Sequence, residues 1–160
     1  PFMQVFVRAV CTATLGACDG ALDAFIEVAK TRQAGPTKMK NDPFARVLAA
    51  EAKAEIEEMK LTMFRNFDAM MACCRAGEPI PIEDRVRYRY DSAIVADRCL
   101  ALSGKMLKAS GSGGIREDSD LLSFHLDILA SQAHVANNST PFAANLGGVL
   151  FGEENADFAL

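Results

Sequence analysis

The sequence predicts an all-α fold, an antiparallel up-and-down bundle of long helices. Half of the 160 residues are hydrophobic, Ala, Leu and Met are prominent, and there is no Trp and only two Tyr. This composition favours helices over strands. Apolar positions recur at helical spacing between prolines and glycines that mark the ends of segments. Some segments approach thirty residues, a length that is typical of helices packed in a bundle.

The first helix is expected from Phe2 to about Thr31, because apolar residues recur there with a helical period. Glycine inside a helix costs stability, so the close approach of a partner helix is the natural compensation. A stripe of small residues on this helix would permit such an approach: Ala9, Ala13, Gly16 and Gly20. Residues 33–41 contain Gly-Pro and lysines and are expected to form an exposed loop.

The second helix has recognisable start and stop signals. Asp42 can cap its N-terminus, and Pro43 suits the first helical position. Gly77 can turn left-handed at the C-terminus, and Pro79 prevents continuation. We therefore expect a helix of more than thirty residues between these signals.

The third helix is expected to begin between Pro81 and Asp84 and to end at Ser110. Residues 85–91 alternate like a strand, but the apolar positions after them continue a 3.6-residue pattern, so we predict a helix throughout. The arginines of this stretch could clamp a phosphate, although solvated ion pairs with neighbouring carboxylates are the expected arrangement. They are Arg85, Arg87 and Arg89.

The fourth helix is expected to be capped by Asp118 or Ser119 and to run to about Asn137. A last short helix should begin at Thr140-Pro141 and end near Phe151. The chain then divides into a helical bundle domain, residues 1–152, and a flexible tail, residues 153–160.

Charge and composition exclude several classes of protein. The net charge is −4 with both signs interspersed, so no broad basic surface favours nucleic acid. No apolar run is expected to span a bilayer, and no signal peptide is recognisable. The first residue is Pro1, not Met, and it leads directly into a helical pattern, so we expect a piece of a longer protein.

The cysteines do not predict a metal site or a disulfide framework. Their number, five, is odd, their spacing is not that of metal ligands, and only two histidines are present. Free and largely buried thiols in a reducing cytoplasm are expected.

The fourth helix should carry a polar stripe opposite its apolar face. Its members recur at i, i+4, i+7 and i+11 and would project from one side: Asp127, Ser131, His134 and Asn138. Histidine titrates most easily near neutral pH. Asp127 and His134 are about 10 Å apart along such a helix, which is too far for a direct dyad. A solvated surface stripe is the alternative interpretation.

A glycine-rich turn precedes this helix. It comprises Ser110, Gly111, Ser112, Gly113, Gly114 and Ile115. Glycines permit close backbone approach, and N–H groups near a helix N-terminus suit a phosphate. A helix C-cap with a flexible linker is the alternative.

The chain resembles the C-terminal helical domain of flavin monooxygenases with the acyl-CoA dehydrogenase fold. The residues that carry this resemblance are the glycine turn, Asp127 and His134-Val-Ala-Asn-Asn138. These are oxygenase components of two-component systems, such as 4-hydroxyphenylacetate and secosteroid phenol hydroxylases. The resemblance extends over the whole chain, including Leu15-Gly16, the basic end at Lys30-Thr-Arg32, and Gly147-Gly148.

The resemblance implies a cofactor, partners and roles for residues. Reduced flavin, FMN or FAD, would bind mainly through domains outside this chain. The whole protein would be a cytoplasmic homotetramer, and a flavin reductase component would supply its reduced flavin. The glycine turn would approach the flavin or its phosphate. His134 would act near the flavin and a small phenolic substrate, with Asp127, Ser131 and Asn138 around it. The isolated fragment would be inactive.

Two departures from the family pattern are visible. Leu126 stands where an Arg often precedes the aspartate, with His125 one position earlier. The glutamate base and Tyr-Gly-Gly-type motif of acyl-CoA dehydrogenases are not matched, so the monooxygenase branch is preferred. An acyl-CoA dehydrogenase domain and a non-catalytic helical oligomerisation module are the competing hypotheses.

Overall fold

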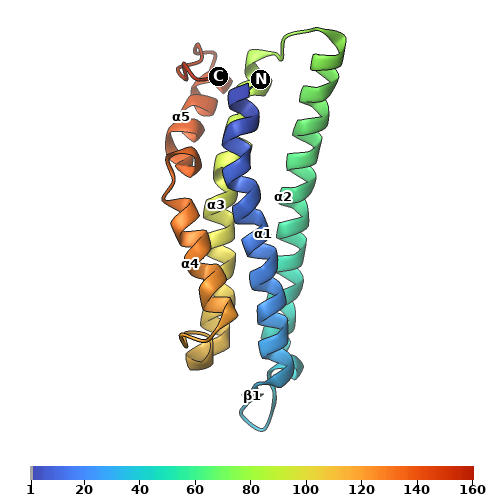
Figure 1. Ribbon diagram of the computed structural model, residues 1–160, viewed down its shortest axis with the longest axis vertical. Helices are drawn as coiled ribbons and strands as arrows, with labels where there is room; N and C mark the ends of the chain where they lie inside the picture. Colours follow the sequence, from blue (N-terminus) through green and yellow to red (C-terminus); the bar gives the residue numbers. More distant parts are fainter. Residues whose placement is uncertain (1) are drawn as a thin grey trace.

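The prolines and glycines singled out above mark the ends of the long helices in the computed structural model, which describes residues 2–160. The helices are α1 (Phe2–Thr31), α2 (Pro43–Ala76), α3 (Ile82–Ser110), α4 (Asp120–Gln132) and α5 (Ser139–Leu150). Figure 1 shows an elongated antiparallel bundle with α2 on one side of α1 and α3. On the other side α4 and α5 follow one another end to end and together form the fourth rod. The all-α bundle is confirmed.

The expected caps of α2 are present. The Asp42 side chain accepts a hydrogen bond from Phe44 N at 3.0 Å, and Pro43 is the first helical residue. At the other end Gly77 has a φ of 69°, and its N–H donates to the carbonyls of Cys73 and Cys74. The left-handed conformation explains why glycine occupies this position.

The loop between α1 and α2 contains a small hairpin. Strands β1 (Gln33–Ala34) and β2 (Thr37–Lys38) pair antiparallel and are followed by the 3-10 helix η1 (Met39–Asn41). Most of the hairpin is exposed as expected, but the Met39 side chain is buried in the core. This methionine therefore attaches the hairpin to the end of the bundle.

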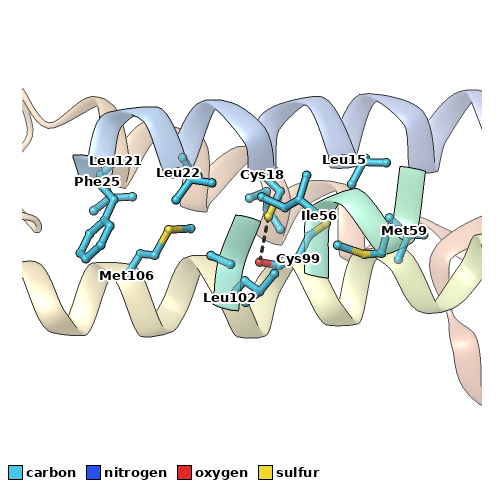
Figure 2. Close-up of a cluster of buried hydrophobic side chains, with 14 of the residues drawn as sticks. Leu15, Cys18, Leu22, Phe25, Ile56, Met59, Cys99, Leu102, Met106 and Leu121 are labelled. Carbon is cyan, nitrogen blue, oxygen red and sulfur yellow. Dashed lines mark hydrogen bonds between the residues drawn. The ribbon is translucent and has the colours of Figure 1, made fainter. Parts of the chain in front are cut away.

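The core lies between α1, α2 and α3, with α4 closing one side. Figure 2 shows Leu15, Leu22 and Phe25 of α1 facing Leu102 and Met106 of α3. Each of these side chains is almost completely removed from water, and such burial is the main favourable term in folding. The Cys18 thiol donates to the Cys99 carbonyl at 3.9 Å in the middle of this cluster.

Helix α1 is more apolar than expected, since residues Met3–Thr31 are long and apolar enough to cross a membrane. It packs against α2, α3 and α4, however, and buries Cys11, Leu15 and Phe25 among them. A core helix of a soluble protein passes the same test of length and composition. The packing thus accounts for the apolar sequence.

The fourth helix is shorter than expected, because α4 ends at Gln132 and not near Asn137. Residues Val135–Asn137 form a separate 3-10 helix, η3. The Asn137 side chain donates to the Ser131 carbonyl at 2.9 Å, and His134 Nδ1 accepts from Ala136 N at 3.1 Å. Such local bonds from side chain to backbone compete with the helical ladder.

The break between α4 and α5 is attached to α3 by one carboxylate. Asp97 of α3 accepts a hydrogen bond from the Gln132 amide at 3.0 Å and another from the Ser139 hydroxyl. Gln132 is the last residue of α4, and Ser139 is the first of α5. Asp97 therefore holds both ends of the break against the bundle.

The small-residue stripe of α1 has two environments that predict opposite effects of alanine. A Cβ at Gly20 would lie 2.6 Å from the Phe124 ring of α4, whereas a Cβ at Gly16 would meet nothing within 4 Å. Gly16→Ala should raise the free energy of unfolding by roughly 0.5–1 kcal/mol, the usual gain in a helix interior. Gly20→Ala should lower it by about 1 kcal/mol, since Phe124 must move. Urea denaturation measures both; changes of equal sign and size would contradict the packing of α4 on Gly20.

The cysteines are free, but only Cys11, Cys18 and Cys99 are buried, while Cys73 is half-buried and Cys74 is exposed. Burial also raises the pKa of the Cys11 thiol to about 11. Reaction with a chromogenic disulfide at pH 8 should therefore begin at Cys74, and the three buried thiols should react only on unfolding. The variant Cys74→Ser should lose the fastest phase; a fast phase of unchanged size would show that another thiol is accessible.

Candidate functional site

The four residues of the predicted polar stripe do not share a helix face. Asp127 and Ser131 lie on α4, whereas His134 and Asn138 follow its end. Asp127 and Asn138 are exposed. Ser131 contacts Thr14 of α1 through its hydroxyl and accepts two hydrogen bonds from the Asn137 amide. Ser131 thus connects α1 to the break after α4.

His134 lies at the turn into η3, with its ring held from one side. Its Nδ1 accepts the backbone N–H of Ala136 at 3.1 Å, so Nδ1 carries no proton in this arrangement. In the neutral ring the proton is then on Nε2, which is available as a donor to a ligand. The end of α4, and not its face, therefore orients this histidine.

An apolar cavity of about 340 Å³ lies beside His134. Its walls come from the beginning of α1, the beginning of α3, η3, the beginning of α5 and the end of the chain. Apolar members include Val7, Val135, Phe142 and Phe158. This cavity was not predicted, since its walls come from segments distant in the sequence.

Arg89 of α3 is one of the polar residues that line this cavity. Only 7% of its surface is exposed, and Nη1 donates to the Ala136 carbonyl at 2.9 Å. The guanidinium also lies 3.5 Å from the centre of the Phe142 ring. The prediction of solvated ion pairs for the three arginines is correct for Arg87, which pairs with Asp84 at 2.7 Å, and wrong for Arg89.

The last residues of the chain lie over the cavity. Asn145 of α5 donates from its amide nitrogen to Asn155 Oδ1 and accepts from Ala156 N, both at 2.8 Å. Asp157 and Phe158 then line the cavity. The segment 153–160 has no helix or strand, and its flexibility stays a prediction.

The glycine turn is at the other end of α4. Gly111 has a φ of 56°, and a Cβ there would lie 2.7 Å from Nη2 of Arg32, at the end of α1. The turn therefore needs glycine at this position for two reasons, backbone conformation and room for the guanidinium. Ser112, Gly113 and Ile115 are exposed beside it.

Other members of the turn are structural. A Cβ at Gly114 would lie 2.7 Å from the Ser110 Cβ, so this glycine permits tight packing at the end of α3. Ser110 is fully buried, and its hydroxyl lacks a hydrogen-bond partner among the described residues. Neither residue is accessible to a ligand.

A groove of about 610 Å³ separates the turn from α1. Gly113 lines it together with four carboxylates and one arginine, Arg116, which is already paired with Asp118 at 2.9 Å. The carboxylates are Asp23, Glu27, Asp118 and Asp120. A phosphate would be repelled inside this groove. A phosphate fits the side of the turn where Arg32 lies over Gly111.

The glycine turn precedes α4, which is labelled in Figure 1, and His134 follows the other end of this helix. The 13 residues of this helix correspond to about 20 Å. One flavin ring system cannot contact both places in the same chain. The described residues also contain no group of three His, Cys, Asp or Glu side chains placed to hold a metal ion.

The hydrogen bonds of the former stripe predict different effects of alanine at two neighbouring positions. Ser131→Ala removes the hydroxyl that contacts Thr14 and Asn137, so it should lower the free energy of unfolding by about 1–3 kcal/mol. Asp127→Ala is the matched control at an exposed position and should change it by less than about 0.5 kcal/mol. Thermal denaturation of both variants is the measurement, and equal melting temperatures would show that the Ser131 contacts contribute nothing.

Comparisons with known proteins agree on one family. The model of the acyl-CoA dehydrogenase C-terminal domain matches residues 9–139. The flavin-dependent monooxygenase oxygenase subunit HsaA of Rhodococcus jostii (strain RHA1) is 29% identical over 141 residues, which are 86% of this chain and 37% of that protein.

Solved structures show the same relationship. The 3-HSA hydroxylase from Rhodococcus sp. RHA1 superposes on 100% of this chain and 41% of its own, with a TM-score of 0.89 and 27% identity. Butyryl-CoA dehydrogenase from Megasphaera elsdenii covers 93% of this chain and 37% of its own, with a TM-score of 0.73 and 17% identity, so it shows the shared fold alone. The chain thus spans about two fifths of the length of these proteins. Since the helical bundle and the family match agree, this chain belongs to the acyl-CoA dehydrogenase C-terminal domain family.

Proposed function

We propose that this chain is the C-terminal domain of the oxygenase component of a flavin-dependent monooxygenase, which hydroxylates an aromatic or related substrate with reduced flavin and O2. The observation that carries the proposal is the apolar cavity beside His134. Apolar walls with a few oriented polar groups are typical of small-molecule sites. The similarity to oxygenase subunits over most of the chain supports it.

The flavin would supply the redox chemistry, and this chain would contribute to holding it. Arg32 and the backbone of Gly111–Gly113 are suited to a phosphate, because a cation lies against exposed backbone there. This place is about 20 Å from His134, so it would serve the far end of the cofactor or a second cofactor in an assembly. The choice between FMN and FAD stays open.

His134 would orient the substrate. With Nδ1 occupied by the Ala136 N–H, Nε2 can donate a hydrogen bond to a substrate oxygen. Action as a base would require the ring to release Ala136 first. The geometry therefore supports positioning of the substrate better than deprotonation.

The acyl-CoA dehydrogenase hypothesis requires a glutamate base near the substrate. Among the described residues that line the cavity, one has a carboxylate side chain, Asp157, and none is a glutamate. The TM-score is also lower for the dehydrogenase, 0.73, than for the hydroxylase, 0.89. Both observations favour the monooxygenase branch.

We also propose partners: a flavin reductase component and further copies of this chain, in the cytoplasm. Self-association, as a tetramer in the whole protein, is supported by apolar side chains along the outer side of α2. These are exposed in the chain alone, as a surface normally covered would be: Phe44, Val47, Leu61, Phe64 and Met71. The open Gly16 on α1 could allow a second close contact.

Replacement of His134 tests the proposal in the whole oxygenase with its reductase. His134→Asn retains an acceptor for the Ala136 N–H, so folding should be nearly unchanged. Hydroxylation should fall by about 10²-fold, because the substrate is no longer held in its reactive position. Oxygen consumption should persist and yield hydrogen peroxide. The measurement is the ratio of hydroxylated product to oxygen consumed.

His125 is the matched control. Its Nδ1 lies 2.9 Å from the Ser103 hydroxyl inside the bundle, so it is a structural histidine. His125→Asn should lower the melting temperature and leave the ratio unchanged. If His134→Asn behaves in the same way, His134 is structural, and the non-catalytic helical module becomes the better interpretation.

A further inference from the structure

Arg89 is a buried cation with unused hydrogen-bonding capacity. Its guanidinium has five N–H donors, and the described residues supply acceptors for Nη1 alone, the Ala136 carbonyl at 2.9 Å and the Ser92 hydroxyl at 3.5 Å. Arg89 lines the cavity beside His134. The remaining donors are thus available to a molecule in that cavity.

The charge of Arg89 is also not neutralised by an ion pair. Among the described residues no carboxylate lies within 4.0 Å of its guanidinium. Buried charges are normally paired, since an isolated one is costly. Burial lowers the pKa of Arg89 to about 10, which leaves the side chain charged at neutral pH.

A second buried cation adds to the field at this end of the bundle. Arg8 of α1 is 1% exposed and donates to the carbonyls of Gln4 and Tyr88, each at 2.7 Å. Its acceptors are neutral groups, so its charge is not cancelled by them. Arg8 and Arg89 repel each other electrostatically, which is one cause of the lowered pKa of Arg89. An anion between the walls of the cavity would relieve this repulsion.

The rest of the cavity is suited to hydrocarbon. Met3, Val7 and Phe142 lie along it, and the Phe142 ring stacks on the guanidinium. A volume of about 340 Å³ is sufficient for a small organic molecule. The cavity therefore combines one buried cation with walls that are mostly apolar.

We propose that this cavity binds an amphipathic organic anion, with a carboxylate or phenolate oxygen on the free donors of Arg89 and a hydrocarbon body against Phe142. The inference rests on the proposed function to the extent that this anion is the substrate oriented by His134. Arg89 is then the residue that sets the charge of the accepted molecule.

Asp157 of the C-terminal segment competes with a bound anion for the positive charge of Arg89. It lines the same cavity and interacts with the charge of Arg89 without forming an ion pair. Its Oδ1 accepts the N–H of Ala159 at 2.9 Å, which holds the carboxylate in the segment. A bound anion and the Asp157 carboxylate repel each other. Binding of the anion therefore either moves the C-terminal segment away from Arg89 or is weakened by the Asp157 charge.

The test measures binding without flavin, reductase or turnover. The probes are 4-phenylbutyrate and its neutral amide, which have nearly the same shape. Protein labelled with [¹³C]methyl-methionine reports binding through Met3, which lines the cavity, and Met3→Leu assigns the signal. The anion should bind at least about tenfold more tightly than the amide, because charge-assisted hydrogen bonds to Arg are strong.

Three variants make the test specific. Arg89→Gln should reduce the ratio of the two affinities to about one. Asp157→Asn should strengthen binding of the anion roughly threefold and leave the amide unchanged. Arg87→Gln, the exposed neighbour paired with Asp84, should change neither affinity.

Equal affinities of anion and amide in the wild type would overturn the inference, as would an unchanged ratio in a folded Arg89→Gln protein. If Arg89→Gln does not fold, the wild-type ratio and Asp157→Asn still decide. A preserved anion preference with no effect of His134→Asn on hydroxylation would retain the binding site and reject the proposed function. If the wild type shows no preference for the anion but His134→Asn strongly reduces hydroxylation, the proposed function is retained and the anion site is rejected.

Discussion

Burial of α1 between the other helices is the constraint on which the rest of the structure depends. Leu15, Leu22 and Phe25 are removed from water by α3, and Gly20 admits the Phe124 ring of α4. The apolar character of α1, sufficient by length and composition for a membrane span, is used in this packing. Because α3 and α4 both contact α1, the position of α4 along the bundle is fixed, and its two ends lie about 20 Å apart. The glycine turn and His134 are separated for this reason.

The break after Gln132 converts an ordinary bundle into one with a cavity. A continuous fourth helix would carry His134 and Asn138 along the side of the bundle. Instead, Asp97 holds the ends of α4 and α5, and Asn137 folds back on Ser131. This arrangement brings His134 to the same cavity as Phe142 and Arg89. The hydrogen bonds of Ser131 and Asn137 therefore have a structural role, since they hold the segment that contains His134.

The two ends of the bundle have different chemistry. One end offers a cation, Arg32, over the exposed backbone of a glycine turn, next to an acidic groove. The other offers an apolar cavity with a buried cation and a histidine whose Nε2 is free to donate. Under the proposed function, the two places would hold different parts of a large cofactor and its substrate, and other domains or other copies would complete each site. The share of the relatives' length that this chain spans, about two fifths, agrees with such a division.

The sequence by itself determined the helices and most of their ends, because capping and helix breaking are local. Asp42, Pro43 and Gly77 act through their own backbone and nearest neighbours, so their roles could be read without the fold. The resemblance carried by the glycine turn and His134 predicted the family that the comparisons show. The break after α4, by contrast, depends on Asp97, about forty residues earlier in the chain. The spacing of apolar residues near the break therefore could not predict it.

Only the tertiary structure decided the environment of each polar side chain. Arg87 and Arg89 look equivalent in a stretch that alternates charged and apolar residues, yet one pairs with Asp84 at the surface and the other is buried under Phe142. The difference arises because Arg89 faces α5 and η3, segments that are remote in sequence. Desolvation depends on such distant neighbours, so the charge of the cavity could not be predicted from local pattern.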